Sequence, residues 1–280
     1  MIESIRMFVA LCCSVLAVLA GLAGGALAQS APREVKGEFS AVRLLNAGPV
    51  DGAWQAGIHV TLQPGWKTYW RVPGESGVPP QFDWSASGNV AGVSVDMPVP
   101  LRFSDGNGDG IGYKTEVIFP VTVSPANPEQ PVRLDLKMFY AVCNDICVPV
   151  QAELGLELSA DSVSAADRFR LKLAANDLPK PAAGQPVIIH AMRLAETADG
   201  EPALEVSISG LPSPAKADIF AESGTTAYFR KPELVSVADG QATYRLMVDG
   251  LQGPDALRGQ PVRLTIAAGG TNIAHEGLVQ

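Results

Sequence analysis

Residues 132–158 read VRLDLKMFYAVCNDICVPVQAELGLEL and contain two segments of strict alternation. In the first segment, Val132–Tyr140, apolar side chains occupy every second position and charged side chains occupy most positions between them. The second segment, Val150–Leu158, repeats the pattern. A period of two is typical of a half-buried β-strand. The stretch therefore predicts two strands, joined by a connection that carries Cys143 and Cys147.

Further strand-like segments lie on both sides of this stretch. They are Trp54–Gln63, Trp66–Val72, Asn89–Asp96, Glu116–Val123, Val187–Leu194, Ala203–Ile208, Ala215–Ala221, Ala242–Val248 and Val262–Ala267. Turn-forming residues such as Pro64 and Gly65 separate them. Many short strands at such spacing indicate an all-β protein built from β-sandwiches.

The order of these segments predicts the domain organisation. Residues 161–185 interrupt the strands: Ser162–Asn176 fits a short helix, and Leu178–Gly184 is a Pro-rich linker. We expect residues 1–28 to be a signal peptide, 29–160 to be the first sandwich domain, and 186–280 to be a second sandwich domain.

The N-terminus predicts export. Arg6 precedes the apolar run Met7–Leu22, and small residues lead up to Ala28, where we expect cleavage. An uncleaved membrane anchor is the alternative. The net charge of −8, from 21 Lys and Arg against 29 Asp and Glu, argues against nucleic acid as a partner.

Cys143 and Cys147 become the only cysteines once the leader, with Cys12 and Cys13, is removed. In an oxidising compartment they can form a disulfide. A bridge enclosing so few residues stabilises a fold by only about 2 kcal/mol on the chain-entropy model, which favours thiol–disulfide exchange over a structural role. A structural disulfide and a soft-metal site, for example for Cu(I), remain alternatives.

The residues beside the cysteines in sequence are acidic or apolar. Asp145 lies between them, and Val142, Ile146 and Val148 flank them. With no neighbouring Lys, Arg or His, we expect a thiol pKa near or above its usual value. The reduced pair would then need a docked partner to become reactive.

Several motifs together resemble the N-terminal periplasmic domain of the DsbD family. They are Pro64–Trp70 (PGWKTYW), Gly77–Trp84 (GVPPQFDW), Phe119–Val123 (FPVTV) and the cysteine segment, in that order. The ScsB-type branch is most similar, because its cysteines are also spaced C-x-x-x-C. The resemblance covers about residues 38–158, and more weakly the C-terminal part.

The resemblance implies two immunoglobulin-like β-sandwich domains and a role in thiol–disulfide interchange. Cys143 and Cys147 would be the catalytic residues, one attacking the partner and the other resolving the mixed disulfide. An aromatic residue of a cap loop would shield them, and Phe103 and Tyr113 are the candidates. No cofactor is implied.

The resemblance also implies partners. These would be periplasmic thioredoxin-like or disulfide-isomerase-like proteins, in a setting such as cytochrome c or copper-tolerance assembly. Full-length relatives continue into a multi-span membrane domain and a thioredoxin-like domain, and this sequence ends at Gln280 with neither. We therefore expect a separate membrane protein to donate electrons as a thiol.

Other sites are weaker candidates. Asp105, Asn107, Asp109 and Glu116 fit the spacing of a calcium loop, but Gly112 stands where the pattern has a hydrophobic residue. The four tryptophans fit a sandwich core better than a sugar-binding platform. No hydrolase motif occurs.

The sequence thus favours a periplasmic electron-transfer module that resembles a protein-disulfide reductase; whether it is itself an enzyme stays open. The alternative is a non-enzymatic binding or copper-handling protein, in which the pair is a metal site or a structural disulfide.

Overall fold

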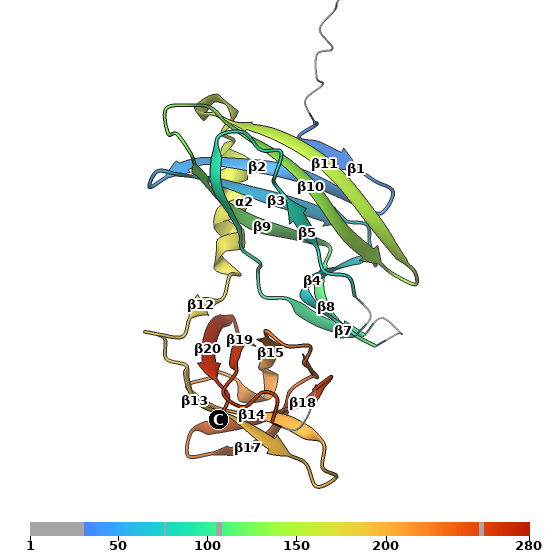
Figure 1. The fold of residues 1–280 in the computed structure, drawn as a ribbon, viewed down its shortest axis with the longest axis vertical. Helices are drawn as coiled ribbons and strands as arrows, with labels where there is room; N and C mark the ends of the chain where they lie inside the picture. Colours follow the sequence, from blue (N-terminus) through green and yellow to red (C-terminus); the bar gives the residue numbers. More distant parts are fainter. Residues whose placement is uncertain (1–30, 76, 105–107, 252–254) are drawn as a thin grey trace, which may run out of the picture. The chain divides into compact units, whose positions relative to one another are not determined.

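The computed structural model describes residues 31–75, 77–104, 108–251 and 255–280. Within these ranges nearly all regular structure is β-strand, arranged in four sheets, as Figure 1 shows. Two sheets form a first sandwich from the N-terminal half of the chain, and two form a second sandwich from the C-terminal part. The prediction of an all-β, immunoglobulin-like fold is confirmed.

The first sandwich packs a five-stranded sheet, ordered β1-β2-β3-β9-β6, against a six-stranded sheet, ordered β11-β10-β4-β8-β7 with β5 beside β10. Its strands are β1 (Glu34–Lys36), β2 (Ser40–Val50), β3 (Ala53–Leu62), β4 (Lys67–Gly74), β5 (Gln81–Asp83), β6 (Val90–Val95), β7 (Leu101–Ser104), β8 (Asp109–Lys114), β9 (Glu116–Pro125), β10 (Val132–Cys143) and β11 (Cys147–Leu158).

The hairpin β10–β11 is the longest regular pairing in this sandwich. Its register runs without a break from Val132 opposite Leu158 to Cys143 opposite Cys147. The alternating apolar side chains of β10, among them Leu134 and Leu136, are buried in the core between the two sheets. The predicted face is therefore confirmed, and the odd-numbered residues of β10 lie on the opposite, outer face of the sheet.

The second sandwich contains the sheets β12-β20-β19-β15 and β13-β14-β18-β16, with β17 also paired to β18. Its strands are β12 (Lys180–Pro181), β13 (Ile188–Glu196), β14 (Pro202–Ser209), β15 (Asp218–Ser223), β16 (Tyr228–Phe229), β17 (Glu233–Ala238), β18 (Gln241–Asp249), β19 (Pro261–Ala268) and β20 (Thr271–Leu278). A separate core of aliphatic side chains with Phe229 and Tyr244 fills it.

The segment between the sandwiches differs in part from the expected linker. After a 3₁₀ turn, η2 (Ala160–Ser162), the expected helix is present as α2 (Ala165–Asn176), but Lys180–Pro181 then pairs in parallel with β20. Part of the Pro-rich stretch is therefore an edge strand of the second sandwich. A second 3₁₀ turn, η3 (Pro214–Lys216), precedes β15.

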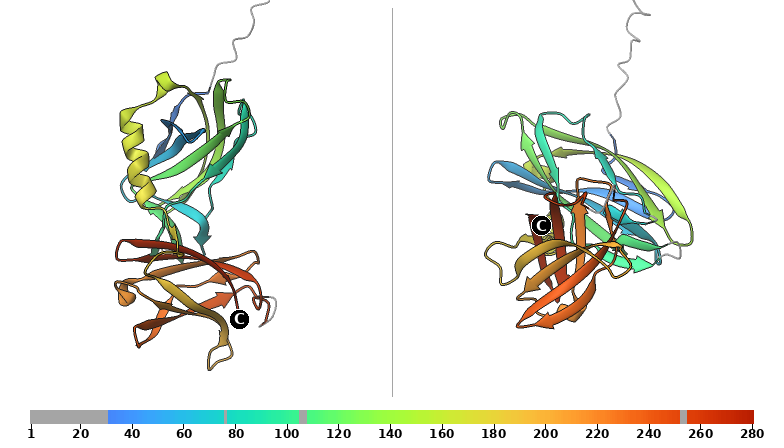
Figure 2. Two further views of the ribbon diagram at one scale, coloured as in Figure 1. Left: turned by 90° about the vertical axis from the view of Figure 1, so that its left-hand side faces the viewer. Right: turned by 60° about the horizontal axis from the view of Figure 1, so that its bottom comes forward.

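Helix α2 lies along one side of the first sandwich, as the left view of Figure 2 shows. Ser164 caps it by accepting a hydrogen bond from the Asp167 backbone N–H. Leu171 is buried against Gly57 of β3, where a Cβ would lie 2.6 Å from the Leu171 Cδ2 atom. Phe169 of the same helix is 62% exposed.

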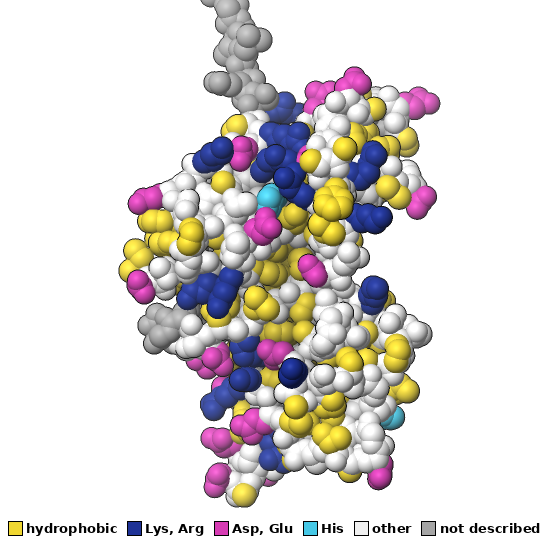
Figure 3. Space-filling view, turned by 180° about the vertical axis from the view of Figure 1, so that it is seen from behind, with side chains coloured by type: hydrophobic (Ala, Val, Ile, Leu, Met, Phe, Trp, Pro, Cys, Tyr) yellow, Lys and Arg dark blue, Asp and Glu magenta, His cyan; other side chains and the backbone are white. Residues whose placement is uncertain are grey.

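A buried carboxylate joins this helix to the sheet. The Asp167 side chain is fully buried and forms ion pairs with Arg33 and Arg43. It also accepts a hydrogen bond from the Asn46 backbone N–H of β2. Lys and Arg side chains gather in the upper half of the face that Figure 3 shows. The two arginines in turn neutralise the Asp167 carboxylate, which would be costly to bury without a positive partner.

Side chains of the first sandwich also contact β15 of the second, within the compact unit Pro32–Gln280. Arg71 donates from Nε and Nη2 to the Glu222 carboxylate, both at 2.6 Å. The edge of the neighbouring Trp70 ring meets Phe220 at a centroid distance of 5.7 Å. A bidentate pair and an aromatic contact therefore link the two sandwiches.

We predict that Asp167→Ala lowers the free energy of unfolding by about 3 kcal/mol, because it leaves Arg33 and Arg43 without their buried partner. Chemical denaturation of the variant measures this loss. Asp161→Ala is the matched control: it removes an exposed carboxylate from η2, and we expect a change within about 0.5 kcal/mol. Equal effects of the two substitutions would contradict a structural role for Asp167.

Candidate redox site

The site is a disulfide at the turn end of the β10–β11 hairpin. Cys143 is the last residue of β10, Cys147 is the first residue of β11, and a bond joins their sulfurs. The turn between them is closed by a hydrogen bond from the Asn144 backbone N–H to the Ile146 carbonyl, at 3.1 Å. The two cysteines are directly opposite each other, so their side chains share one face of the sheet.

The two cysteines differ sharply in exposure. Cys143 is only 1% exposed, whereas Cys147 is exposed. Ile146, beside Cys147 at the tip of the turn, is 64% exposed. A docking protein can therefore reach Cys147, while Cys143 is covered by its neighbours.

A small aromatic cluster covers Cys143 on the outer face of the sheet. It consists of Tyr69, Phe103, Ala141 and Cys143, with Val78 packed against it. Phe103 is 6% exposed, and its ring centroid lies 6.1 Å from that of Tyr69. This cluster is separate from the main sandwich core, which lies on the other side of β10.

Phe103 reaches the cluster because β8 presents no side chain at the position opposite it. Phe103 of β7 pairs with Gly110 of β8. A Cβ at Gly110 would lie 2.4 Å from the Phe103 Cε2 atom, so any larger residue would displace the ring. Of the two predicted shielding residues, the structure therefore brings Phe103 into the cluster with Cys143.

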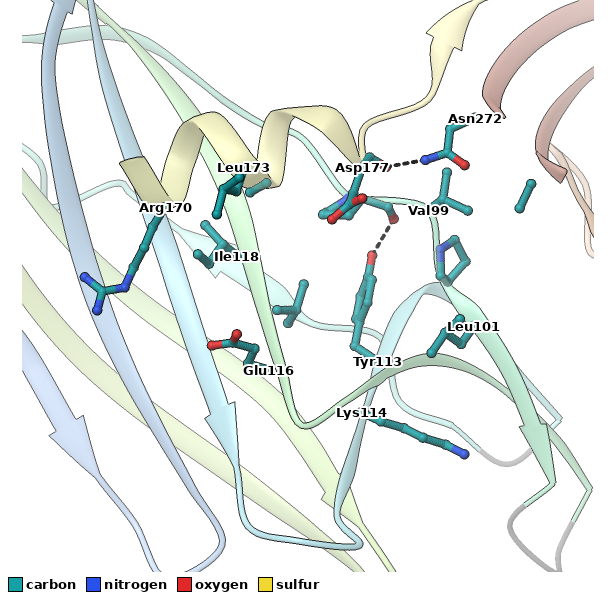
Figure 4. Close-up of a pocket in the computed structure, with 15 residues that line it drawn as sticks. Val99, Leu101, Tyr113, Lys114, Glu116, Ile118, Arg170, Leu173, Asp177 and Asn272 are labelled. Carbon is teal, nitrogen blue, oxygen red and sulfur yellow. Dashed lines mark hydrogen bonds between the residues drawn. The ribbon is translucent and has the colours of Figure 1, made fainter. Parts of the chain in front are cut away.

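Tyr113 lies on the other face of the same sheet. It is part of the main core, packs edge-on against Phe119 at 5.5 Å, and donates a hydrogen bond to the Pro98 carbonyl at 2.8 Å. Figure 4 shows its hydroxyl directed into a pocket that α2 and β9 also line, with Glu116 and Leu173 nearby. Burial raises the pKa of this phenol above its usual range. Tyr113 does not cover the cysteines.

The sequence did not predict two residues that lie beside the disulfide. Tyr69 directs its hydroxyl to Cys147 Sγ at 3.7 Å, and Lys67 is the cross-strand partner of Cys143. Both come from the PGWKTYW motif, whose alternation places Lys67 and Tyr69 on one face of β4. The motif shows which residues share a face, but the pairing of β4 with β10 is a tertiary contact that local sequence does not specify.

Lys67 changes the electrostatic surroundings expected for the pair. No cation is adjacent to the cysteines in sequence, but in space Lys67 lies beside Cys143 and is only 9% exposed. Its ammonium lies 5.3 Å from the centroid of the Phe103 ring, and that of Lys114 lies 5.5 Å from it. The premise that the pair lacks a cationic neighbour is therefore wrong.

The calcium-loop candidates are only partly within the described structure. Asp105 and Asn107 lie outside the described residues. Asp109 accepts a backbone hydrogen bond from Glu75 through its carbonyl, at 3.0 Å, and Glu116 lies 2.8 Å from His59 Nε2. In the part of the chain that the structure describes, no cluster of three or more His, Cys, Asp or Glu side chains has the geometry of a metal site.

Comparison with known proteins agrees with this geometry. Residues 41–158 match the family model described as "Thiol:disulfide interchange protein DsbD, N-terminal". The structure is similar to the crystal structure of the N-terminal periplasmic domain of ScsB from Proteus mirabilis, with a TM-score of 0.68 and 20% sequence identity, over 89% of this chain and 98% of that one. No curated protein matches the chain. Among the described residues, no helix is long and apolar enough to cross a membrane.

We predict that Phe103→Ala makes reduction of the Cys143–Cys147 disulfide by a small thiol such as dithiothreitol roughly tenfold faster. The reason is that loss of the ring opens the covered side of the disulfide to the attacking thiol. A tenfold faster rate corresponds to an activation barrier lower by about 1.4 kcal/mol, which is less than the burial of a phenylalanine side chain contributes. Quenched-flow alkylation with mass analysis measures the rate.

Phe169→Ala is the matched control for this variant, since it removes an exposed phenylalanine from α2. We expect it to leave the reduction rate within twofold of the parent rate, roughly the scatter of a neutral surface change. An unchanged rate in a folded Phe103→Ala variant would contradict shielding by this ring.

Proposed function

Because residues 41–158 form a DsbD-like N-terminal domain, we propose that this protein passes electrons to the disulfides of partner proteins through Cys143 and Cys147. The observation that carries the proposal is the pairing of one exposed cysteine with one buried cysteine in a single disulfide at the turn of a regular hairpin. The family match and the disulfide support thiol–disulfide exchange in general.

The difference in exposure supports an order of steps. In the reduced protein, the Cys147 thiolate attacks one sulfur of the partner's disulfide; a mixed disulfide forms and the partner's other sulfur leaves as a thiolate. The Cys143 thiolate then attacks Cys147 Sγ. This forms the Cys143–Cys147 disulfide and releases the partner's second thiolate, so two electrons have passed to the partner.

The hairpin geometry suits the second step. Cys143 and Cys147 are held opposite each other with a Cα–Cα distance of 4.1 Å, so no strand has to move for Cys143 to reach Cys147. Holding two reacting groups together in this way raises their effective concentration. Because Cys143 is covered, other thiols cannot easily react with it. This favours release of the partner over side reactions.

We propose the periplasm as the site of action and thioredoxin-like or disulfide-isomerase-like proteins as the partners. DsbD-family N-terminal domains exchange electrons with thioredoxin-like proteins in general, which supports this choice. A separate membrane protein with a thiol pair would return the Cys143–Cys147 disulfide to the reduced state by the reverse sequence of steps.

Trapping experiments test the proposal. In a Cys143→Ser variant, Cys147 can form a mixed disulfide that nothing resolves, so we expect periplasmic partners to be captured and released by dithiothreitol. In a Cys147→Ser variant, the remaining sulfur is buried, and we expect little capture. Capture only by Cys147→Ser would reverse the assigned order, and no capture by either variant would contradict exchange.

The reduction potential separates exchange from a purely structural disulfide. We expect a value well above the roughly −300 mV below which structural disulfides typically lie. Equilibration with glutathione buffers, read by mass analysis of the alkylated protein, measures it. A potential below that limit would instead favour a structural bridge.

A further inference from the structure

We infer that Lys67 stabilises the thiolate of Cys143 during exchange, and so sets how readily the pair releases and accepts electrons. The inference rests on the proposed function, but it concerns a property that the isolated reduced protein already has. Lys67 is a positioning residue: it forms no bond with the partner and acts only through the effect of its charge on Cys143.

The sheet register places the lysine beside the sulfur. The order β11-β10-β4-β8 brings four residues into one row: Cys147 opposite Cys143, Cys143 opposite Lys67, and Lys67 opposite Lys114. Side chains of directly opposite residues in antiparallel strands lie on the same face, with Cβ atoms about 5 Å apart. The Lys67 side chain therefore starts next to Cys143.

A second contact fixes this end of β4 to β10. The Thr68 hydroxyl donates a buried hydrogen bond to the Ala141 carbonyl at 2.9 Å, and Val142 pairs with Thr68. Slippage of β4 by one residue would turn Lys67 to the other face of the sheet, so this bond holds the lysine on the cysteine face.

Burial makes the charge effective. Lys67 is 9% exposed, whereas Lys114, next in the row, is exposed. In the described part of the chain, Lys67 forms no ion pair with a carboxylate. Its ammonium lies over the Phe103 ring, which packs with Cys143. Charges interact more strongly where protein replaces water, so a thiolate at Cys143 would feel Lys67 more than it feels Lys114.

Titratable or charged groups on the elements that pack around Cys143 include Cys147 on β11, Tyr69 on the same strand as Lys67, Lys114 on β8 and the exposed Asp145 in the turn. Tyr69 directs its hydroxyl to Cys147 Sγ and carries no positive charge. Lys67 is therefore the buried cation available to the inner sulfur.

The chemistry gives this cation a role in both directions. When a donor thiolate attacks exposed Cys147 Sγ, the bond to Cys143 breaks and its electron pair leaves on Cys143 Sγ. When a partner is reduced, the same Cys143 thiolate attacks Cys147 Sγ and expels the partner's thiolate. A positive charge beside Cys143 stabilises it as a leaving group and increases the fraction ready to attack.

The closing experiment measures the acid dissociation constant of the Cys143 thiol. The reduced full chain carrying Cys147→Ser is titrated, and the Cβ chemical shift of Cys143 is followed by NMR, which separates it from Cys12 and Cys13. We expect Lys67→Met to lower the dissociation constant about tenfold, since a neighbouring opposite charge typically shifts a pKa by about one unit or more. Lys67→Arg should restore it to within about threefold of the parent value.

Lys114→Met is the matched control, because it removes the other cation over Phe103 and leaves the buried one. We expect it to change the dissociation constant less than about threefold. An equal effect of Lys67→Met and Lys114→Met, or no effect of Lys67→Met, would overturn the inference. If Lys67→Met does not fold, as judged by tryptophan fluorescence, Lys67→Gln takes its place.

A second readout uses both cysteines. The equilibrium of the Cys143–Cys147 disulfide with glutathione should be the same for the parent and Lys67→Met at acidic pH, where the thiols are protonated. Above the thiol pKa, the equilibrium constants of the two proteins should differ about tenfold, equivalent to about 30 mV in reduction potential. The Lys67→Met variant should have the lower potential, because its disulfide is harder to reduce. A difference independent of pH would indicate a structural effect and overturn the inference.

These outcomes are separable from those of the trapping experiment. If no partner is trapped but the dissociation constant falls in Lys67→Met, the proposed function fails and the effect of Lys67 on the thiol stands. If partners are trapped and the constant does not change, exchange stands and Lys67 has no part in it.

Discussion

The unbroken register of the β10–β11 hairpin is the constraint on which the site depends. It aligns Val132 with Leu158 at one end and Cys143 with Cys147 at the other. Because one face of both strands is buried in the sandwich core, a slip by one residue would expose the core side chains and bury charged ones. The energy that holds the two sulfurs opposite each other therefore comes from apolar burial along the whole hairpin, and little of it from the short disulfide itself.

The two faces of the β10–β11 hairpin have different roles: one packs into the sandwich core, and the other carries the cysteines. Tyr140 and Val142 face the core, whereas Ala141 and Cys143 face outward into a small cluster with Tyr69 and Phe103. The chemical residues thus lie on a surface that can be covered or opened without disturbing the main core. This separation suits a protein that must keep one sulfur protected and offer the other to a partner.

Charge is organised in a comparable way at two places in the first sandwich. At Asp167, a fully buried carboxylate is neutralised by arginines and joins α2 to the sheet. Lys67 is buried, its ammonium lies over the Phe103 ring, and its cross-strand partner is Cys143. The charges around Asp167 neutralise each other and stabilise the fold. The charge of Lys67 would be neutralised only when a thiolate forms at Cys143, as we infer above.

The sequence by itself determined the all-β class, the hairpin and the cysteine pair, because alternation with a period of two is a local property of the chain. Phe103 as a shielding residue came from the resemblance to a family, and the structure places it beside Cys143 while it places Tyr113 in the core. Only the tertiary structure decided that Lys67, more than seventy residues from Cys143, is its neighbour. The physical reason is that the lateral order and register of strands distant in the chain follow from the packing of whole sheets, which no short segment encodes.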